Sequence, residues 1–178
     1  MLPALPKYSH VTYELQSPEF KEVHTYIVGL EWAMSMPLVE GTIIIIDLDR
    51  FSEVVRERGW SEYKPNPATA LLTRLVERIV TRWRAVVIYG LDEERGTEEV
   101  VLEIPYTEPE ELLPDLEDVK REINRLGVGV TIVAVKGYVG LKPARNRREA
   151  YTATPYRRLA YRLLREAKRR GGNRIVVS

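Results

Sequence analysis

Residues 42–49 read Thr42-Ile-Ile-Ile-Ile-Asp47-Leu48-Asp49. Four consecutive isoleucines leave no alternation of apolar and polar side chains, which is typical of a strand covered on both faces and so central in its sheet. The apolar run ends on two carboxylates, and residues i and i+2 of a strand face the same side. The stretch therefore predicts both the centre of a sheet and an acidic site at one end of it.

The elements around this strand follow from hydrophobic periodicity and from glycine and proline positions. They come in the order β, α, α, β, β, α, β, α, β. The expected strands are 42–47, 85–89, 100–104, 128–138 and 174–177. The expected helices are 51–58, 68–83, 107–126 (bent or restarted at Pro114) and 155–170, and a basic loop is expected over 140–151.

This order of elements predicts an α/β (α+β) domain of ferredoxin-like, palm type. Strands 85–89 and 100–104 are close enough in sequence to form an antiparallel hairpin. Helical crossovers favour partly parallel pairing elsewhere, which gives a mixed sheet with helices packed on it. We place this palm domain at 41–178 and regard residues 1–40 as an N-terminal extension that packs on the core.

Composition excludes several classes of protein. The 178 residues contain no cysteine, which rules out a disulfide scaffold or a thiolate site. Only His10 and His24 are available for a histidine-based zinc site, and both are expected to be structural. No apolar run is long enough to span a membrane and the start does not read as a secretory signal, so we expect a cytoplasmic protein without a membrane partner. Abundant charge and a single glutamine are typical of a thermophile.

The net charge is +1, but the charges are segregated along the chain. Residues 91–122 hold 13 acidic and 3 basic side chains, whereas residues 142–174 hold 12 basic and 2 acidic ones. One interpretation is a pair of solvated helix faces. The other is a basic wall that binds phosphates, RNA or single-stranded DNA. Overall neutrality argues against a dedicated binder of duplex DNA.

The carboxylates at the end of the first strand predict a cation. Asp47 and Asp49 would repel each other unless a cation lies between them, and their oxygens suit Mg²⁺ (or Mn²⁺). Alternatively, Asp47 only begins a turn and Asp49 caps the following helix. In a palm fold the hairpin lies beside this strand, so Asp92 and Glu93 could complete a site that activates a nucleoside triphosphate. An ordinary acidic turn is the alternative for the hairpin.

Several segments together resemble the GGDEF domains of the diguanylate cyclase family. Ile46-Asp47-Leu48-Asp49-Arg50-Phe51 is similar to D-[IL]-D-x-F, and Tyr89-Gly90-Leu91-Asp92-Glu93-Glu94 is similar to the Y-G-G-D-E-F hairpin. Thr107-Glu-Pro-Glu-Glu111 resembles T-x-P-E-E, and residues 167–177 resemble the closing A-K-x-x-G-R-N-x-V-V. The match keeps the family's order over residues 42–177, about three quarters of the chain.

This resemblance implies a role for each matching residue. Asp47, the Leu48 carbonyl and Asp92 would bind the metal ion, with Glu93 as the neighbouring acid. Lys168, with Arg169 nearby, would contact the triphosphate. The backbone at Phe51 and Ser52 would offer N–H groups to phosphates.

The sequence also departs from the family pattern. Leu91 replaces the second signature glycine, Ser52 falls at the first-helix lysine, Val55 falls at the guanine-reading asparagine, and Gly172 replaces the closing arginine. Diguanylate cyclase activity is therefore not expected. We expect a divergent palm that binds a nucleoside triphosphate with Mg²⁺ and could form a phosphodiester. The alternatives are an inactive nucleotide-binding or regulatory module, which could act as a homodimer, and an RNA- or single-stranded-DNA-binding module.

Overall fold

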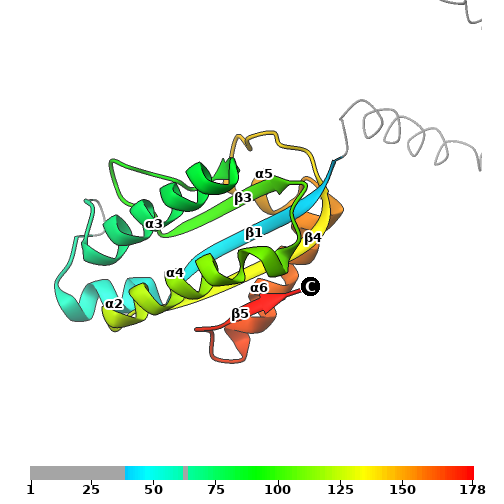
Figure 1. Cartoon of the computed structure of the whole chain (residues 1–178). Helices are drawn as coiled ribbons and strands as arrows, with labels where there is room; N and C mark the ends of the chain where they lie inside the picture. The colour runs from blue at the N-terminus through cyan, green and yellow to red at the C-terminus, as the bar shows by residue number, and fades with distance from the viewer. Residues whose placement is uncertain (1–38, 62–63) are drawn as a thin grey trace, which may run out of the picture. The chain divides into compact units, whose positions relative to one another are not determined.

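A computed structural model describes residues 39–61 and 64–178 (Figure 1). The expected extension lies outside these residues except for its last two positions, and so do His10 and His24. The strands are β1 (Val39–Asp49), β2 (Val86–Tyr89), β3 (Glu99–Pro105), β4 (Gly129–Val139) and β5 (Ile175–Val177). They form one five-stranded sheet in the order β2-β3-β1-β4-β5. The predicted central strand is therefore the middle strand.

The pairing of the strands confirms a mixed sheet of ferredoxin-like type. β1 is antiparallel to both β3 and β4, and β2 is antiparallel to β3. Only β4 and β5 pair in parallel. Parallel pairing is rarer than we expected. The helices after β1 lead to the edge strand β2, and β3 lies between β1 and β2, so these two strands do not pair with each other.

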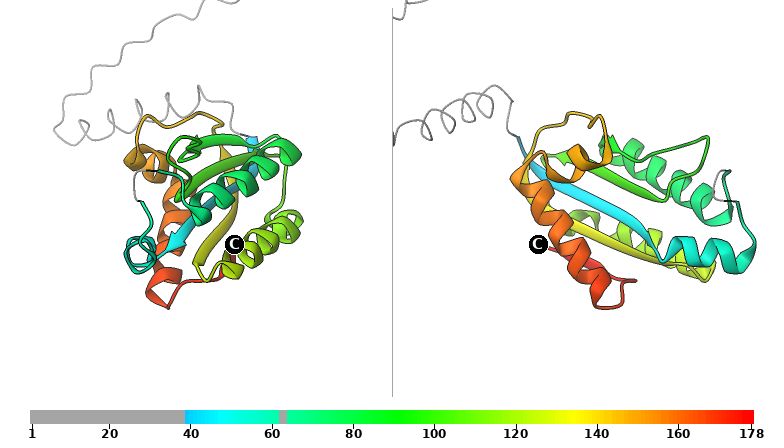
Figure 2. Two further views of the ribbon diagram at one scale, coloured as in Figure 1. Left: turned by 90° about the vertical axis from the view of Figure 1, so that its left-hand side faces the viewer. Right: turned by 180° about the vertical axis from the view of Figure 1, so that it is seen from behind.

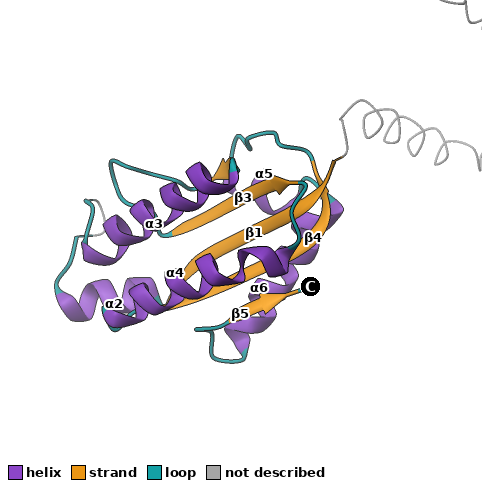
Figure 3. Ribbon diagram, viewed as in Figure 1, coloured by secondary structure: helices purple, strands orange, loops and turns teal. Residues whose placement is uncertain are grey.

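Helices cover both faces of the sheet (Figures 1 and 3). They are α2 (Phe51–Arg58), α3 (Pro67–Trp83), the 3₁₀ helix η1 (Pro109–Leu112), α4 (Leu113–Arg125), α5 (Arg147–Thr152) and α6 (Pro155–Arg169). Ile44 and Ile46 pack into a core with α3 and α4, whereas Ile43 and Ile45 pack into a second core with α5 and α6. Figure 2 shows α6 on the face opposite to α3. The isoleucine run is buried on both sides, as its lack of alternation predicted.

Two elements differ locally from expectation. The helix expected over 107–126 starts as a 3₁₀ turn and becomes α-helical at Leu113, next to Pro114. A proline fits the first turn of a helix because its missing N–H has no partner there. The expected basic loop contains the short helix α5, which is capped by Asn146 accepting from Glu149 N at 2.9 Å. Six residues are too few to give a readable helical period.

This topology brings distant segments to one edge of the sheet. Because β1 runs antiparallel to both neighbours, its C-terminal end meets the first residues of β3 and β4, with Asp47 opposite Glu99 and Asp49 opposite Gly129. Helix α2 starts at the same place. Within residues 39–61 and 64–178, no helix combines the length and apolar character needed to cross a membrane.

Candidate functional site

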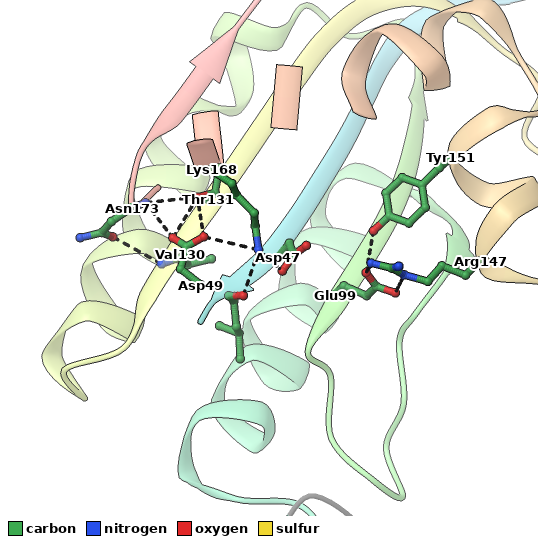
Figure 4. A network of polar contacts seen from close by, with 10 residues as sticks. Asp47, Asp49, Glu99, Val130, Thr131, Arg147, Tyr151, Lys168 and Asn173 are labelled. Carbon is green, nitrogen blue, oxygen red and sulfur yellow. Dashed lines mark hydrogen bonds and ion pairs between the residues drawn. The ribbon is translucent and has the colours of Figure 1, made fainter. Parts of the chain in front are cut away.

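The C-terminal end of β1 carries a compact ionic group, here called the β1-end cluster: Asp47, Leu48, Asp49 and Lys168. The Lys168 ammonium donates to Asp47 Oδ1 at 2.5 Å and to the Leu48 carbonyl at 3.1 Å. It also lies 3.5 Å from Asp49 Oδ1 (Figure 4). Lys168 comes from the last turn of α6, more than a hundred residues along the chain. The two carboxylates do share a cation, and in this structure the cation is an ammonium.

Asp49 also ties the end of the chain to the sheet. Its carboxylate accepts from Thr131 Oγ1 at 2.7 Å and from the backbone N–H of Asn173 at 2.7 Å. The expectation that Asp49 caps the next helix is wrong, because the N-cap of α2 is Arg50, which makes no side-chain cap bond. A Cβ on Gly172 would lie 2.8 Å from the Asp49 carboxylate. A side chain at position 172 would therefore require the Asp49 carboxylate to move.

Burial raises the pKa of Asp47 above its ordinary 3.8. The hydrogen bond and charge of Lys168 oppose this rise in the pKa, while the nearby carboxylates of Glu99 and Asp49 add to it. A partly desolvated carboxylate beside an ammonium is stable only while the pair holds. Asp47 therefore depends on Lys168 for its charge.

Glu99 is the residue that the β1–β3 register places opposite Asp47. Its carboxylate accepts two hydrogen bonds from Arg147, Nε at 2.5 Å and Nη2 at 2.7 Å, and one from the Tyr151 hydroxyl at 2.8 Å. Burial and the Glu99 charge raise the pKa of Tyr151. Figure 4 shows this second group next to the β1-end cluster. Both carboxylate oxygens of Glu99 therefore accept hydrogen bonds from residues of helix α5.

A cavity of about 410 Å³ lies against both groups and the start of α2. Its lining residues come from five segments and are Asp47, Leu48, Arg50, Phe51, Ser52, Glu98, Glu99, Arg147 and Lys168. The first N–H groups of an α-helix have no partner within the helix, and here no side chain caps them. Such a helix start beside cationic side chains is suited to an anionic group.

Five of the predicted site residues line one cavity, and the other three do not line it. Asp47, Leu48, Phe51, Ser52 and Lys168 line this one cavity. The remaining ones are Asp92 and Glu93 in the hairpin turn and Arg169, which is exposed at the end of α6.

Asp92 lines a neighbouring cavity of about 400 Å³, which shares Glu98 and Glu99 with the Asp47 cavity but does not include Asp47. Its Oδ1 accepts from the backbone N–H groups of Glu94 at 3.0 Å and Arg95 at 2.8 Å, so the side chain stabilises its own turn. Residues 93–98 lie between Asp92 and Glu99, the first residue of β3. The pair that was expected to share an ion, Asp47 and Asp92, is therefore not brought to one cavity.

Sequence reasoning missed Glu98 and Glu99 as cavity residues. The pattern of a glycine, one other residue and then two acids occurs twice in the hairpin, as Gly90-Leu91-Asp92-Glu93 and as Gly96-Thr97-Glu98-Glu99. Only the second copy runs directly into β3, and Leu48 N donates to the Glu98 carbonyl at 3.0 Å. The register of β3 against β1 places the second copy, and not the first, beside Asp47. This register cannot be predicted from a single sequence.

The other departures from the family pattern have structural explanations. Leu91 is partly buried and packs on the core between the sheet and α3. Val55 is only 2% exposed in that same core and does not line the cavity. Ser52, in contrast, is exposed and lines the cavity.

The basic C-terminal third uses several of its cations internally. Arg157 donates to the buried Glu103 at 2.6 Å, Arg147 binds Glu99, and Lys168 binds Asp47. RNA or single-stranded DNA binding by this region stays a prediction. In the part of the chain that the structure describes, no three acidic or histidine side chains are grouped so that they could hold a metal ion.

Comparison with known proteins finds similar folds among solved structures but no similar sequence among family models or curated proteins. No protein-family model matches the chain, and no curated protein matches it. A solved microbial GGDEF domain, studied for its interaction with cyclic di-GMP, superimposes with a TM-score of 0.50 at 20% identity, covering 79% of this chain and 78% of that one. The diguanylate cyclase SiaD of Pseudomonas aeruginosa, solved with its activator SiaC, gives a TM-score of 0.53 at 19% identity, covering 89% of this chain and 68% of that one. The chain has a GGDEF-like fold.

Proposed function

We propose that this chain is a nucleotide-binding domain of GGDEF-like fold that holds phosphate groups in the cavity at the end of β1. The observation that carries the proposal is the convergence of Lys168, Arg147 and the uncapped start of α2 on that cavity. The two similar structures add to it, since one is described with a cyclic dinucleotide and the other is a diguanylate cyclase.

The ion pairs around the cavity do not prevent phosphate binding. The side chain of Lys168 is 31% exposed and that of Arg147 is 57% exposed. Their carboxylate partners are less exposed, Asp47 at 16% and Glu99 at 18%, but both cations are themselves accessible to solvent. A phosphate that gains charge-assisted hydrogen bonds from Lys168, Arg147 and the N–H groups of Phe51 and Ser52 can therefore share these cations with their carboxylates.

The predicted Mg²⁺ (or Mn²⁺) does not fit the residues as they are arranged. Carboxylate and carbonyl oxygens are the ligands that Mg²⁺ prefers. However, Asp47 Oδ1 and the Leu48 carbonyl both bind the Lys168 ammonium, and both Glu99 oxygens bind Arg147. We therefore propose nucleotide binding without phosphodiester formation, as in an inactive or regulatory module, in preference to cyclase activity.

The test is a thermal-unfolding series with each common nucleoside triphosphate and with cyclic dinucleotides. A ligand at one hundred times its Kd adds about 2.7 kcal/mol to the free energy of unfolding, so at least one compound is expected to raise Tm clearly. Chromatography after long incubation should return that compound unchanged. Absence of any rise in Tm would reject nucleotide binding, and a new phosphodiester product would reject the non-catalytic assignment.

A matched pair of variants ties the binding to this cavity. Arg147 is the first residue of helix α5, and Arg145 lies two residues before it. Each arginine pairs with a glutamate, but only Arg147 lines the cavity. Arg147→Met is expected to weaken nucleotide binding by about tenfold, the loss of one charge-assisted contact. Arg145→Met should leave the affinity unchanged. Equal losses in both variants would place the ligand elsewhere.

A further inference from the structure

We infer that Lys168 is a built-in cation of the β1-end cluster, and that this site consequently takes its nucleotide free of any divalent metal ion. The part of the inference that concerns the nucleotide rests on the proposed function. The part that concerns the cation stands on the geometry of the cluster alone.

The position of the ammonium is the first argument. The Nζ atom lies 2.5 Å from Asp47 Oδ1, 3.1 Å from the Leu48 carbonyl and 3.5 Å from Asp49 Oδ1. A divalent ion bound to Asp47 Oδ1 and the Leu48 carbonyl would have to share both oxygens with a positive charge. Repulsion between like charges at such separations costs far more than one exposed hydrogen bond returns. The lysine and the ion are therefore alternatives at this position.

The backbone around Lys168 is the second argument, because it is fixed on both sides. Before it, Leu164 and Ala167 anchor α6 in the core. After it, Gly172 N donates back to the Ala167 carbonyl at 3.0 Å, and Asn173 N donates to Asp49 at 2.7 Å. The residue that anchors this turn, Asp49, is itself a member of the cluster. The fold thus holds the Lys168 backbone within reach of the same three oxygens.

The charge balance of the cavity is the third argument. Its lining holds three acids, which are Asp47, Glu98 and Glu99, and three bases, which are Arg50, Arg147 and Lys168. These acids already face basic side chains and need no added cation. An entering phosphate meets the N–H donors of Lys168, Arg147 and the start of α2, so its oxygens find hydrogen-bond partners without a metal ion.

Manganese titration followed by electron paramagnetic resonance tests the inference without any nucleotide. Wild-type protein is expected to bind no Mn²⁺ at this site, whereas Lys168→Met should gain one bound ion, with an affinity at least about tenfold above background. Adding Asp47→Asn to that variant should abolish the gain. Lys136→Met is the matched control, because Lys136 also pairs with an acid, Glu108, at 2.6 Å, and does not line the cavity.

Two results would overturn the inference. The first is wild-type protein that binds one Mn²⁺ as tightly as the Lys168→Met variant. The second is a folded Lys168→Met variant, judged by circular dichroism, that gains no ion. If that variant does not fold, the wild-type titration still decides: a bound ion that Asp47→Asn removes overturns the inference, and no bound ion supports it.

The nucleotide arm uses the wild-type protein and the compound that raises its Tm. Its affinity in excess EDTA is expected to stay within about threefold of its affinity in Mg²⁺, whereas a tenfold loss in EDTA would overturn metal-free binding. If no nucleotide binds under either condition, the proposed function fails. The manganese titrations then still judge the assignment of Lys168.

Discussion

Helix α6 supplies a cation to the sheet at each of its ends, and the two ion pairs differ in what surrounds them. At its start, Arg157 pairs with Glu103 of β3, and their side chains are 4% and 0% exposed. At its end, Lys168 pairs with Asp47 of β1, and their side chains are 31% and 16% exposed. Both pairs join a strand carboxylate to the same helix.

The buried Arg157–Glu103 pair is surrounded by other groups of the chain. Glu103 Oε1 accepts from Arg157, while Oε2 accepts from Gly140 N at 3.0 Å and Leu141 N at 2.7 Å. Arg157 also donates to the Lys142 carbonyl at 3.2 Å. These contacts fasten the loop after β4 to the sheet and leave no side for a ligand. The Asp47–Lys168 pair lies against a cavity, so its cation can be shared. Burial, rather than the pairing itself, separates a structural pair from one that can bind.

The largest effect is expected from breaking the buried pair. Arg157→Met leaves the buried Glu103 charge without its cation, with only the N–H groups of Gly140 and Leu141 still donating to it, which should cost about 3–5 kcal/mol of the free energy of unfolding. Lys168→Met removes the cation from the Asp47–Lys168 pair, here called the open pair because it lies against the cavity, and should cost at most about 1 kcal/mol. Urea unfolding of both variants measures the difference. Similar losses would show that the two pairs have the same structural role.

The anchoring of the open pair to the C-terminal turn predicts a smaller loss. Gly172→Ala combines a left-handed φ of 65° with a Cβ 2.8 Å from the Asp49 carboxylate, which Thr131 and Asn173 hold in place. We expect a loss of about 2–3 kcal/mol. Gly59→Ala is the matched control, because its φ is 63° and a Cβ there meets nothing within 4 Å.

The control variant should lose only the cost of the left-handed backbone, about 1 kcal/mol. Urea unfolding under the same conditions compares the two glycine variants. Equal losses would mean that the approach of Asp49 to Gly172 adds nothing, and that the C-terminal turn does not depend on the β1-end cluster.

The open pair also predicts a pH effect, which comes from Asp47. Because burial raises its pKa above 3.8, the folded protein holds this proton more tightly than the unfolded chain does. The stability from Asp47 is therefore fully present below pH 3.8 and is lost as pH rises through the raised pKa. The difference in the free energy of unfolding, wild type minus Asp47→Asn, should fall across that window and then level off.

Glu149 provides a control of opposite sign. Hydrogen bonds from Arg145 lower its pKa below 4.5, so its contribution to stability is present above pH 4.5 and is lost as pH falls through the lowered pKa. The difference between wild type and Glu149→Gln should therefore rise with pH. Urea unfolding at a series of pH values measures both differences. A wild-type minus Asp47→Asn difference that rises with pH would contradict the raised pKa of Asp47.

The open pair also shows how far the sequence alone could go. The isoleucine run predicted a doubly covered strand, which the structure confirms. The spacing of Asp47 and Asp49 predicted a Mg²⁺ (or Mn²⁺) ion beside two carboxylates, whereas the cation that the structure places beside them is the Lys168 ammonium. The identity of the cation was out of reach, because Lys168 arrives from a helix that local periodicity cannot place relative to β1.

The hairpin acids were harder for the same reason. Two similar acidic turns compete in the sequence, and only the register of β3 against β1 distinguishes them. The buried pair gave no local signal either. Glu103 lies within a β-rich run and Arg157 within a basic helix, and nothing near either residue predicts that the two charges are buried together.

The smallest effect concerns Asp92, and it separates the two acidic turns. Asp92 accepts two backbone hydrogen bonds in its own turn and lines a cavity other than that of Asp47. Asp92→Ala is therefore expected to cost about 1 kcal/mol of stability and to change nucleotide affinity by less than about twofold. Glu99→Gln, which weakens the hold on Arg147 beside the open pair, should change the affinity more. Isothermal titration of the two variants compares them, and a larger effect from Asp92→Ala would return the functional role to the first acidic turn.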